Sequence, residues 1–323
     1  MIGGSILLII IFSLFLIKSA DWVIVAIRRI SKDSKTAAFT ISALILALGT
    51  SFPELFVGIT SAIEGKPNLA LGVVIGSNIA NISLVAGVTA LVVGRIRVHG
   101  TYLKRDVWIA LAAGVLPLIL VLDTKLSRVD GLILLAVYFA YASSFFRARF
   151  IQIGEEQKQE NFIYRFVRKF YNIDTEKKRE FGRLFVGIAV LLFSANAIVK
   201  LSSALATSFN IPLFVIGLII IAVGTSLPEL AFSFRSIKEH EPSMFFGNLL
   251  GSTIANSTLV LGLVAVIHPI EIIDTNKYFF AAAAFVVIYL TFWQFIRSKH
   301  RLDRREGVVL ILLYVAFLVV QLT

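Results

Sequence analysis

The chain contains no cysteine, and this absence excludes disulfide bonds, thiolate metal sites and cysteine-based redox chemistry. Charge is also scarce, because Asp, Glu, Lys and Arg together make up only 16% of the 323 residues. Hydrophobic residues make up 58% of the chain, and the mean hydropathy is +0.87. Soluble domains carry far more charge than this, so the sequence predicts an integral membrane protein.

The net charge of +11 is the one feature that suggests a nucleic-acid partner. The basic residues, however, stand in short connections between apolar stretches, where the positive-inside rule places them. We therefore expect no nucleic-acid partner, and no obligate protein partner is evident.

Ten apolar stretches are long enough to cross a membrane, which takes about 20 residues. They cover residues 5–27, 37–63, 68–93, 105–122, 130–147, 181–208, 212–236, 243–267, 278–296 and 307–322. The first is too long for a cleaved signal peptide and is expected to be retained. With the N-terminus outside, the cytoplasmic connections hold 25 Lys and Arg residues and the outside connections hold 4. Both termini are therefore predicted to lie outside the cell membrane.

One segment is repeated with a constant offset of 175 residues. Residues 42–90 and 217–265 share 21 identities in 49 positions, including Gly-Thr-Ser-x-Pro-Glu and Gly-Ser-x-Ile-Ala-Asn. The fold class predicted is thus all-α, with ten transmembrane helices in two five-helix repeats, residues 1–147 and 181–323. An odd number of helices per repeat gives the two repeats inverted topology, as in many secondary transporters.

Residues 148–180 form the sizeable polar connection, which is predicted to be cytoplasmic. Its segment 162–171 mixes aromatic and basic residues, which is typical of an amphipathic helix on the inner leaflet. A regulatory peptide segment is the alternative interpretation.

Each repeat places one glutamate inside a span, Glu54 and Glu229. A carboxylate at the centre of a bilayer costs roughly 2.5–3.5 kcal/mol, and such acids are usually functional. Pairing with Lys18 or Lys200 would be a structural explanation. The duplication of the whole motif favours a functional one.

The motif around each glutamate is expected to interrupt its helix. Gly and Pro weaken the helix on either side of the Thr-Ser pair, so the carbonyls of residues 47–49 and 222–224 are predicted to lose their helical partners. Serine and asparagine side chains of the second motif add further oxygens. Oxygen donors without His or Cys suit Ca²⁺ or Na⁺ rather than Zn²⁺ or Cu²⁺.

The two paired motifs and the ten-helix layout resemble the cation/calcium exchanger superfamily, specifically its prokaryotic Na⁺/Ca²⁺ exchanger branch. The resemblance implies that Ca²⁺ is held by Thr50, Glu54, Thr225 and Glu229. It also implies a set of residues for Na⁺ or the central cluster: Ala47, Ser51, Glu54, Ser77, Asn81, Ala222, Ser226, Glu229, Ser252 and Asn256. The first and sixth helices would then slide as a gate across the other eight.

One position departs from the pattern of that family. Many relatives have Asp where this chain has Asn256, and the acid there is associated with potassium co-transport, so no K⁺ requirement is expected. The predicted function is electrogenic exchange of Na⁺ for Ca²⁺ by alternating access, without a cofactor and without enzymatic activity. A Ca²⁺/H⁺ antiporter on the same scaffold and, from a different class, a cation channel are the alternatives.

Overall fold

The computed structural model describes residues 2–31, 50–97, 102–153, 175–238, 242–299 and 301–322, and within them the chain forms ten helical stretches. Seven are single helices: α1 (Ile2–Ser31), α3 (Phe52–Ile63), α6 (Tyr102–Leu120), α7 (Arg128–Ile153), α9 (Thr175–Phe209), α15 (Thr275–Lys299) and α16 (Arg304–Leu322). Three are composite: α4 (Pro67–Ala80) with η1 (Asn81–Val85) and α5 (Ala86–Val93); α10 (Leu213–Ile216) with η2 (Gly217–Ile221), α11 (Ala222–Thr225) and α12 (Leu227–Lys238); and α13 (Pro242–Ile254) with η3 (Ala255–Val260) and α14 (Leu261–Ile267).

The helical membrane architecture is confirmed, and each of the ten predicted spans overlaps one of these stretches. Seven spans in the described ranges are long and apolar enough to cross a membrane, while Phe52–Ile63 and Asp106–Leu120 are shorter apolar helices. At the two ends of the predicted connection 148–180, α7 continues to Ile153 and α9 begins at Thr175. The predicted amphipathic segment 162–171 lies outside the described residues.

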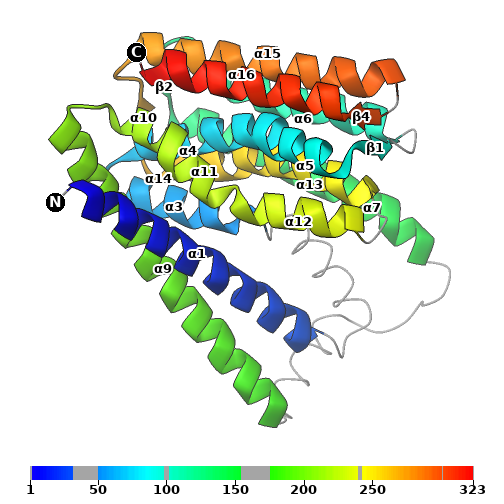
Figure 1. Ribbon diagram of the computed structural model, residues 1–323. Helices are drawn as coiled ribbons and strands as arrows, with labels where there is room; N and C mark the ends of the chain where they lie inside the picture. The colour runs from blue at the N-terminus through cyan, green and yellow to red at the C-terminus, as the bar shows by residue number, and fades with distance from the viewer. Residues whose placement is uncertain are drawn as a thin grey trace.

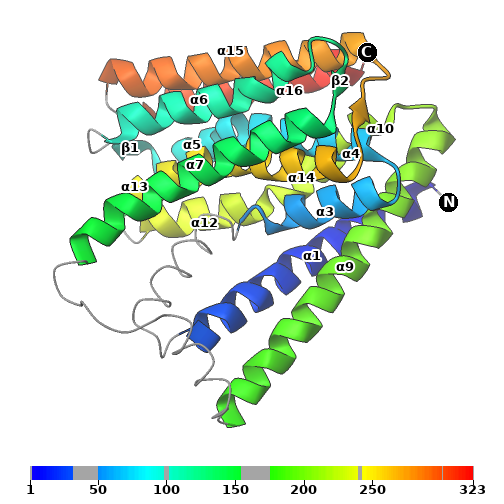
Figure 2. The same ribbon diagram turned by 180° about the vertical axis from the view of Figure 1, so that it is seen from behind.

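The helices enclose two hydrophobic clusters, and α3, α4, α10 and η2 contribute residues to both. The helices α1 and α9 lie against each other and slant across the others, while α15 and α16 lie on the opposite side (Figures 1 and 2). Leu16 of α1, Leu191 of α9 and Val57 of α3 are fully buried in the cluster beneath this pair. A larger cluster fills the space among the remaining helices.

Two short antiparallel strand pairs, which the sequence did not predict, join the two repeats. Strand β1 (Arg95–Arg97) pairs with β4 (Arg301–Asp303), and β2 (Lys125–Leu126) pairs with β3 (Ile270–Glu271). The β2 end of the molecule also carries both chain termini, whereas β1 and β4 lie at the other end (Figures 1 and 2). Each pair therefore fastens one repeat to the other at one end of the helix bundle.

The π-helices η1 and η3 begin at equivalent places in the two repeats. Ser83 and Thr258, which are related by the 175-residue offset, each donate a hydrogen bond to the carbonyl four residues earlier, that of Ile79 and of Ile254. A hydroxyl that takes this carbonyl competes with the α-helical N–H. Local π geometry is frequent at functional sites, and here it begins at the second conserved motif of each repeat.

Candidate ion-binding site

Each glutamate lies just after a break, at the start of a helix. Thr50 and Ser51 form a turn before α3, and Ser226 separates α11 from α12. A proline follows each break within the first turn of the next helix, where its missing N–H has no helical partner to lose. Glu54 and Glu229 consequently lie in the first turns of α3 and α12, close to the positive end of each helix dipole.

The prediction that the carbonyl of Ala222 loses its partners is wrong. This carbonyl accepts the backbone N–H of Ser226 at 3.0 Å and the hydroxyl of Thr225 at 3.3 Å. The break comes only after Thr225, so the last turn of α11 still satisfies it. Ala47, the equivalent residue of the first repeat, lies outside the described residues.

The two carboxyl groups are completely buried, with 0% exposure at both Glu54 and Glu229. Glu54 lies beside the hydroxyls of Ser77 and Thr225, and Glu229 lies beside those of Thr50 and Ser252. Yet in the described part of the chain both oxygens of Glu54 and Oε2 of Glu229 have no hydrogen-bond partner. Neither Lys18 nor Lys200 forms an ion pair with them there.

The threonine of each motif meets the serine of the opposite repeat. Thr50 Oγ1 lies 3.2 Å from Ser252 Oγ, and Ser77 Oγ lies 3.2 Å from Thr225 Oγ1. The two contacts are equivalent under the 175-residue offset, so they are one contact made twice. Ser252 Oγ also reaches Glu229 Oε1 at 3.5 Å. Six predicted ligands thus form one buried polar cluster at the junction of the two repeats.

The remaining predicted residues extend this cluster. Ser51 and Ser226 are 2% and 3% exposed, and their hydroxyls have no partner among the described residues. Asn81 and Asn256 lie one helical turn beyond Ser77 and Ser252 and are 0% exposed. Both amide atoms of Asn81 and Oδ1 of Asn256 are without a partner in the same part of the structure.

Sequence reasoning missed three polar residues that contact this cluster. The hydroxyl of Thr50 donates to Asn248 Oδ1 at 3.0 Å, and Asn256 Nδ2 donates to Asn78 Oδ1 at 3.3 Å. Asn78 Nδ2 in turn donates to Ser257 Oγ at 2.8 Å. The signal that could have revealed them is a difference between the repeats. Under the 175-residue offset, Asn248 corresponds to Val73, Asn78 to Thr253 and Ser257 to Ile82.

This donor set fits a hard cation. Buried polar atoms are almost always hydrogen-bonded, so a group of carboxylate, hydroxyl and amide oxygens without partners is suited to a ligand that accepts their lone pairs. Ca²⁺ takes 6–8 oxygen ligands, and two carboxylates match its charge. No group of three or more His, Cys, Asp or Glu side chains is gathered within the ranges that the structure describes.

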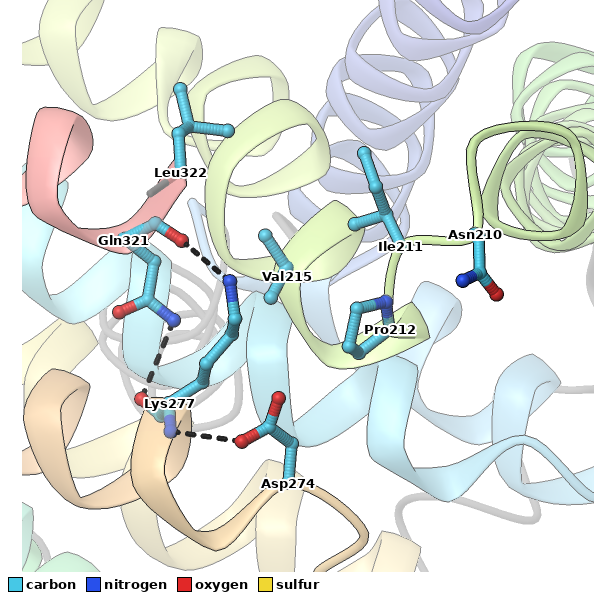
Figure 3. Close-up of a pocket in the computed structure, with 8 residues that line it drawn as sticks. All are labelled: Asn210, Ile211, Pro212, Val215, Asp274, Lys277, Gln321 and Leu322. Atoms are coloured by element: carbon cyan, nitrogen blue, oxygen red, sulfur yellow. Dashed lines mark hydrogen bonds between the residues drawn. The ribbon is translucent and has the colours of Figure 1, made fainter.

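A surface pocket of about 310 Å³ lies elsewhere, where the turn after α9 meets α15 and the end of α16 (Figure 3). Lys277 Nζ donates to the carbonyl of Gln321 at 3.2 Å, and Gln321 Nε2 donates to the carbonyl of Lys277 at 3.3 Å. Asp274 accepts the backbone N–H of Lys277 at 3.1 Å. None of the predicted ion ligands lines this pocket.

Comparison with known proteins places the chain among transporters. Residues 4–147 and 180–323 match the family described as sodium/calcium exchanger protein. The chain is 30% identical to sodium/calcium exchanger MaX1 of Methanosarcina acetivorans, with 99% of each chain covered. It is 31% identical to inner membrane protein YrbG of Escherichia coli K12, with 82% of this chain and 80% of that one covered.

The fold is similar to that of a solved exchanger. The sodium-calcium exchanger NCX_Mj soaked with 10 mM Na⁺ and zero Ca²⁺ superimposes with a TM-score of 0.59 at 25% identity, covering 98% of each chain. The chain therefore belongs to the sodium/calcium exchanger family, a family of multi-pass membrane proteins that are secondary transporters rather than enzymes.

Proposed function

We propose that this protein exchanges Na⁺ for Ca²⁺ across the cell membrane by alternating access, and that the exchange is electrogenic and independent of K⁺. The observation that carries the proposal is the pair of fully buried carboxyl groups, three of whose four oxygens lack hydrogen-bond partners in the described structure. An unpaired buried charge is strongly unfavourable. The carrier should therefore cross between its two states only with cations bound.

The roles proposed for individual residues follow the resemblance to the exchanger family. Thr50, Glu54, Thr225 and Glu229 hold Ca²⁺. Na⁺ uses an overlapping set of oxygens, which includes those of Glu54 and Glu229 again and extends through the central cluster: Ala47, Ser51, Ser77, Asn81, Ala222, Ser226, Ser252 and Asn256. Asn at position 256 limits the site to two carboxylates, which supports independence from K⁺.

The two halves, residues 1–147 and 181–323, are proposed to be inverted repeats with both termini outside and the connection 148–180 in the cytoplasm. The placement of the strands supports the inversion. The strands β1 and β3 are equivalent under the 175-residue offset, yet β1 lies at one end of the bundle and β3 pairs with β2 at the other (Figure 1). The α1–α9 pair, with its own hydrophobic cluster, is the proposed moving gate.

The test is uptake of radiolabelled Ca²⁺ into proteoliposomes loaded with Na⁺, K⁺ or choline, or prepared with an acid interior. Each condition is measured with and without valinomycin. Uptake should require internal Na⁺ and should be faster at an inside-positive potential.

The other outcomes each name a different function. Uptake driven equally well by the proton gradient would replace the proposal with Ca²⁺/H⁺ exchange. Ca²⁺ currents that need no counter-ion would replace it with a channel.

A further inference from the structure

The two asparagines of the site have different surroundings, although they are equivalent in the repeat. Asn81 makes no hydrogen bond through its amide within the described residues, whereas Asn256 donates its Nδ2 to Asn78. Asn78 is buried, with 3% exposure, on α4 of the first repeat. The equivalent position of the second repeat is Thr253, whose hydroxyl bonds to the carbonyl of Leu249 in its own helix. Among the described residues, the second asparagine therefore has an amide partner from the opposite repeat and the first does not.

The three side chains form a hydrogen-bond chain with one direction. Asn256 donates to Asn78 at 3.3 Å, and Asn78 donates to Ser257 at 2.8 Å. Asn256 and Ser257 are 0% and 1% exposed, so water does not compete from the surface. Because the NH₂ group of Asn256 is engaged, its Oδ1 is the free end of this chain, and that oxygen has no donor in the described structure.

The direction of this hydrogen-bond chain decides whether the oxygen or the NH₂ group of Asn256 faces the ion. A serine hydroxyl can donate as well as accept, and a carboxamide presents either an oxygen or an NH₂ group. If Ser257 donated to Asn78 Oδ1, Asn78 would donate to Asn256 Oδ1, and the NH₂ group of Asn256 would be left as the free end. That group carries partial positive charge and repels a cation.

We propose that Asn78, supported by Ser257, is a positioning residue that holds the carboxamide of Asn256 with its oxygen toward the transported ions, and that this selects for Na⁺. The inference rests on the proposed function. Asn256 belongs to the proposed Na⁺ set and not to the Ca²⁺ set. Loss of the positioning contact should thus weaken Na⁺ binding and leave Ca²⁺ binding nearly unchanged.

The test compares Asn78→Leu, Ser257→Ala and the double variant with wild type in proteoliposomes. The internal Na⁺ concentration for half-maximal Ca²⁺ uptake should rise about fivefold in each single variant, since each breaks the chain that orients Asn256 and a neutral hydrogen bond contributes about 1 kcal/mol. The Ca²⁺ concentration for half-maximal uptake should change less than about twofold, because the contact with Asn78 orients Asn256, which is not among the proposed Ca²⁺ ligands. The double variant should be no worse than Asn78→Leu, because both changes break one chain.

Thr253→Val is the matched control, since it alters the equivalent buried position without touching the chain, and it should keep wild-type half-saturation for both ions. Stabilisation of the purified variants by Na⁺ and by Ca²⁺ in thermal unfolding gives the same comparison without transport. An equal loss for both ions, or an unchanged Na⁺ half-saturation in Asn78→Leu, would overturn the positioning role alone. Wild-type uptake that ignores internal Na⁺ would overturn the proposed function itself.

Discussion

The helices that carry the two glutamates are equivalent in sequence but not in surroundings. The helix α3 buries seven residues along its length, whereas the buried residues of α12 are Glu229, Ser233 and Ser236. Helix α9 packs along α3, but the equivalent pair, α1 and α12, makes no comparable contact in the described structure. The helices α1 and α12 diverge toward the end of the molecule away from the termini (Figures 1 and 2). Two copies of one sequence thus occupy two environments, which the proposed alternating-access cycle would require of either of its two states.

The largest expected effect comes from removing the buried carboxylate that α3 and α12 each carry. Glu54→Gln and Glu229→Gln should each reduce exchange about 100-fold or more. Bound Ca²⁺ would then lack one of the two carboxylates that balance its charge, and a buried charge without its counterpart costs roughly 3–5 kcal/mol. Glu64→Gln is the control, since Glu64 is an exposed carboxylate at the end of α3 that accepts a hydrogen bond from Asn196. Initial rates of Ca²⁺ uptake check all three variants. Wild-type exchange by either glutamine variant would remove that carboxylate from the mechanism.

The next effect measures the difference between the helices directly. Phe56 packs beneath the α1–α9 pair, whereas its equivalent, Ala231, is exposed on the same face as Arg235 and Lys238. Because the chain has no cysteine, single Phe56→Cys and Ala231→Cys variants can be labelled without background. The Ala231→Cys thiol should react with a charged maleimide roughly 10-fold faster, since thiol reactivity follows exposure. Equal labelling rates would contradict the asymmetry described here.

A smaller effect is expected where only one repeat supplies a polar partner. Asn248 accepts a hydrogen bond from Thr50 at 3.0 Å, and the first repeat has Val73 at the equivalent position. Asn248→Val should raise the Ca²⁺ concentration for half-maximal uptake about fivefold, since one hydrogen bond of about 1 kcal/mol no longer orients a ligand hydroxyl. Val73→Ile, which keeps an apolar side chain at the equivalent position of the first repeat, should change the Ca²⁺ half-saturation far less. An unaltered Ca²⁺ half-saturation in Asn248→Val would show that Thr50 does not need this acceptor.

The smallest effect concerns the exposed Lys125–Glu271 ion pair at the β2–β3 junction. The hydrogen bond and charge of Lys125 hold the pKa of Glu271 below its usual range. A lowered pKa means that the pair stabilises the folded state above the unfolded-state pKa, and that this contribution is lost as pH falls through the folded-state pKa. Lys125→Met should therefore unfold only slightly earlier than wild type at pH 7, because exposed pairs contribute little. The difference in melting temperature should vanish in acid, and a difference that grows in acid would contradict this assignment.

Much of the architecture was predictable because bilayer physics acts on local sequence. Ten apolar stretches and the repeated Gly-Thr-Ser-x-Pro-Glu motif were enough to place the helices and both glutamates. The π-helices at Asn81 and Asn256 were not predictable, because they depend on competition between a hydroxyl and an N–H for one carbonyl. Nor did the motifs reveal Asn78 and Asn248, which act across the repeat boundary and are absent from the opposite repeat. The hydrogen bonding of the Ala222 carbonyl was mispredicted because the missing N–H of a proline affects only the carbonyl four residues before it, which for Pro228 is that of Gly224.

The strand pairs that join the two halves have a further consequence. Strand β1 is equivalent to β3, and β2 overlaps the equivalent of β4, so β1–β4 and β2–β3 join equivalent segments of the two repeats, with registers that differ by two residues. The Thr50–Ser252 and Ser77–Thr225 contacts obey the same rule. In a homodimer with a two-fold axis, every contact of residue i with residue j is accompanied by that of j with i. The interface between the two repeats of this single chain therefore has the reciprocal form of a homodimer interface, in which each repeat gives the other the contact that it receives.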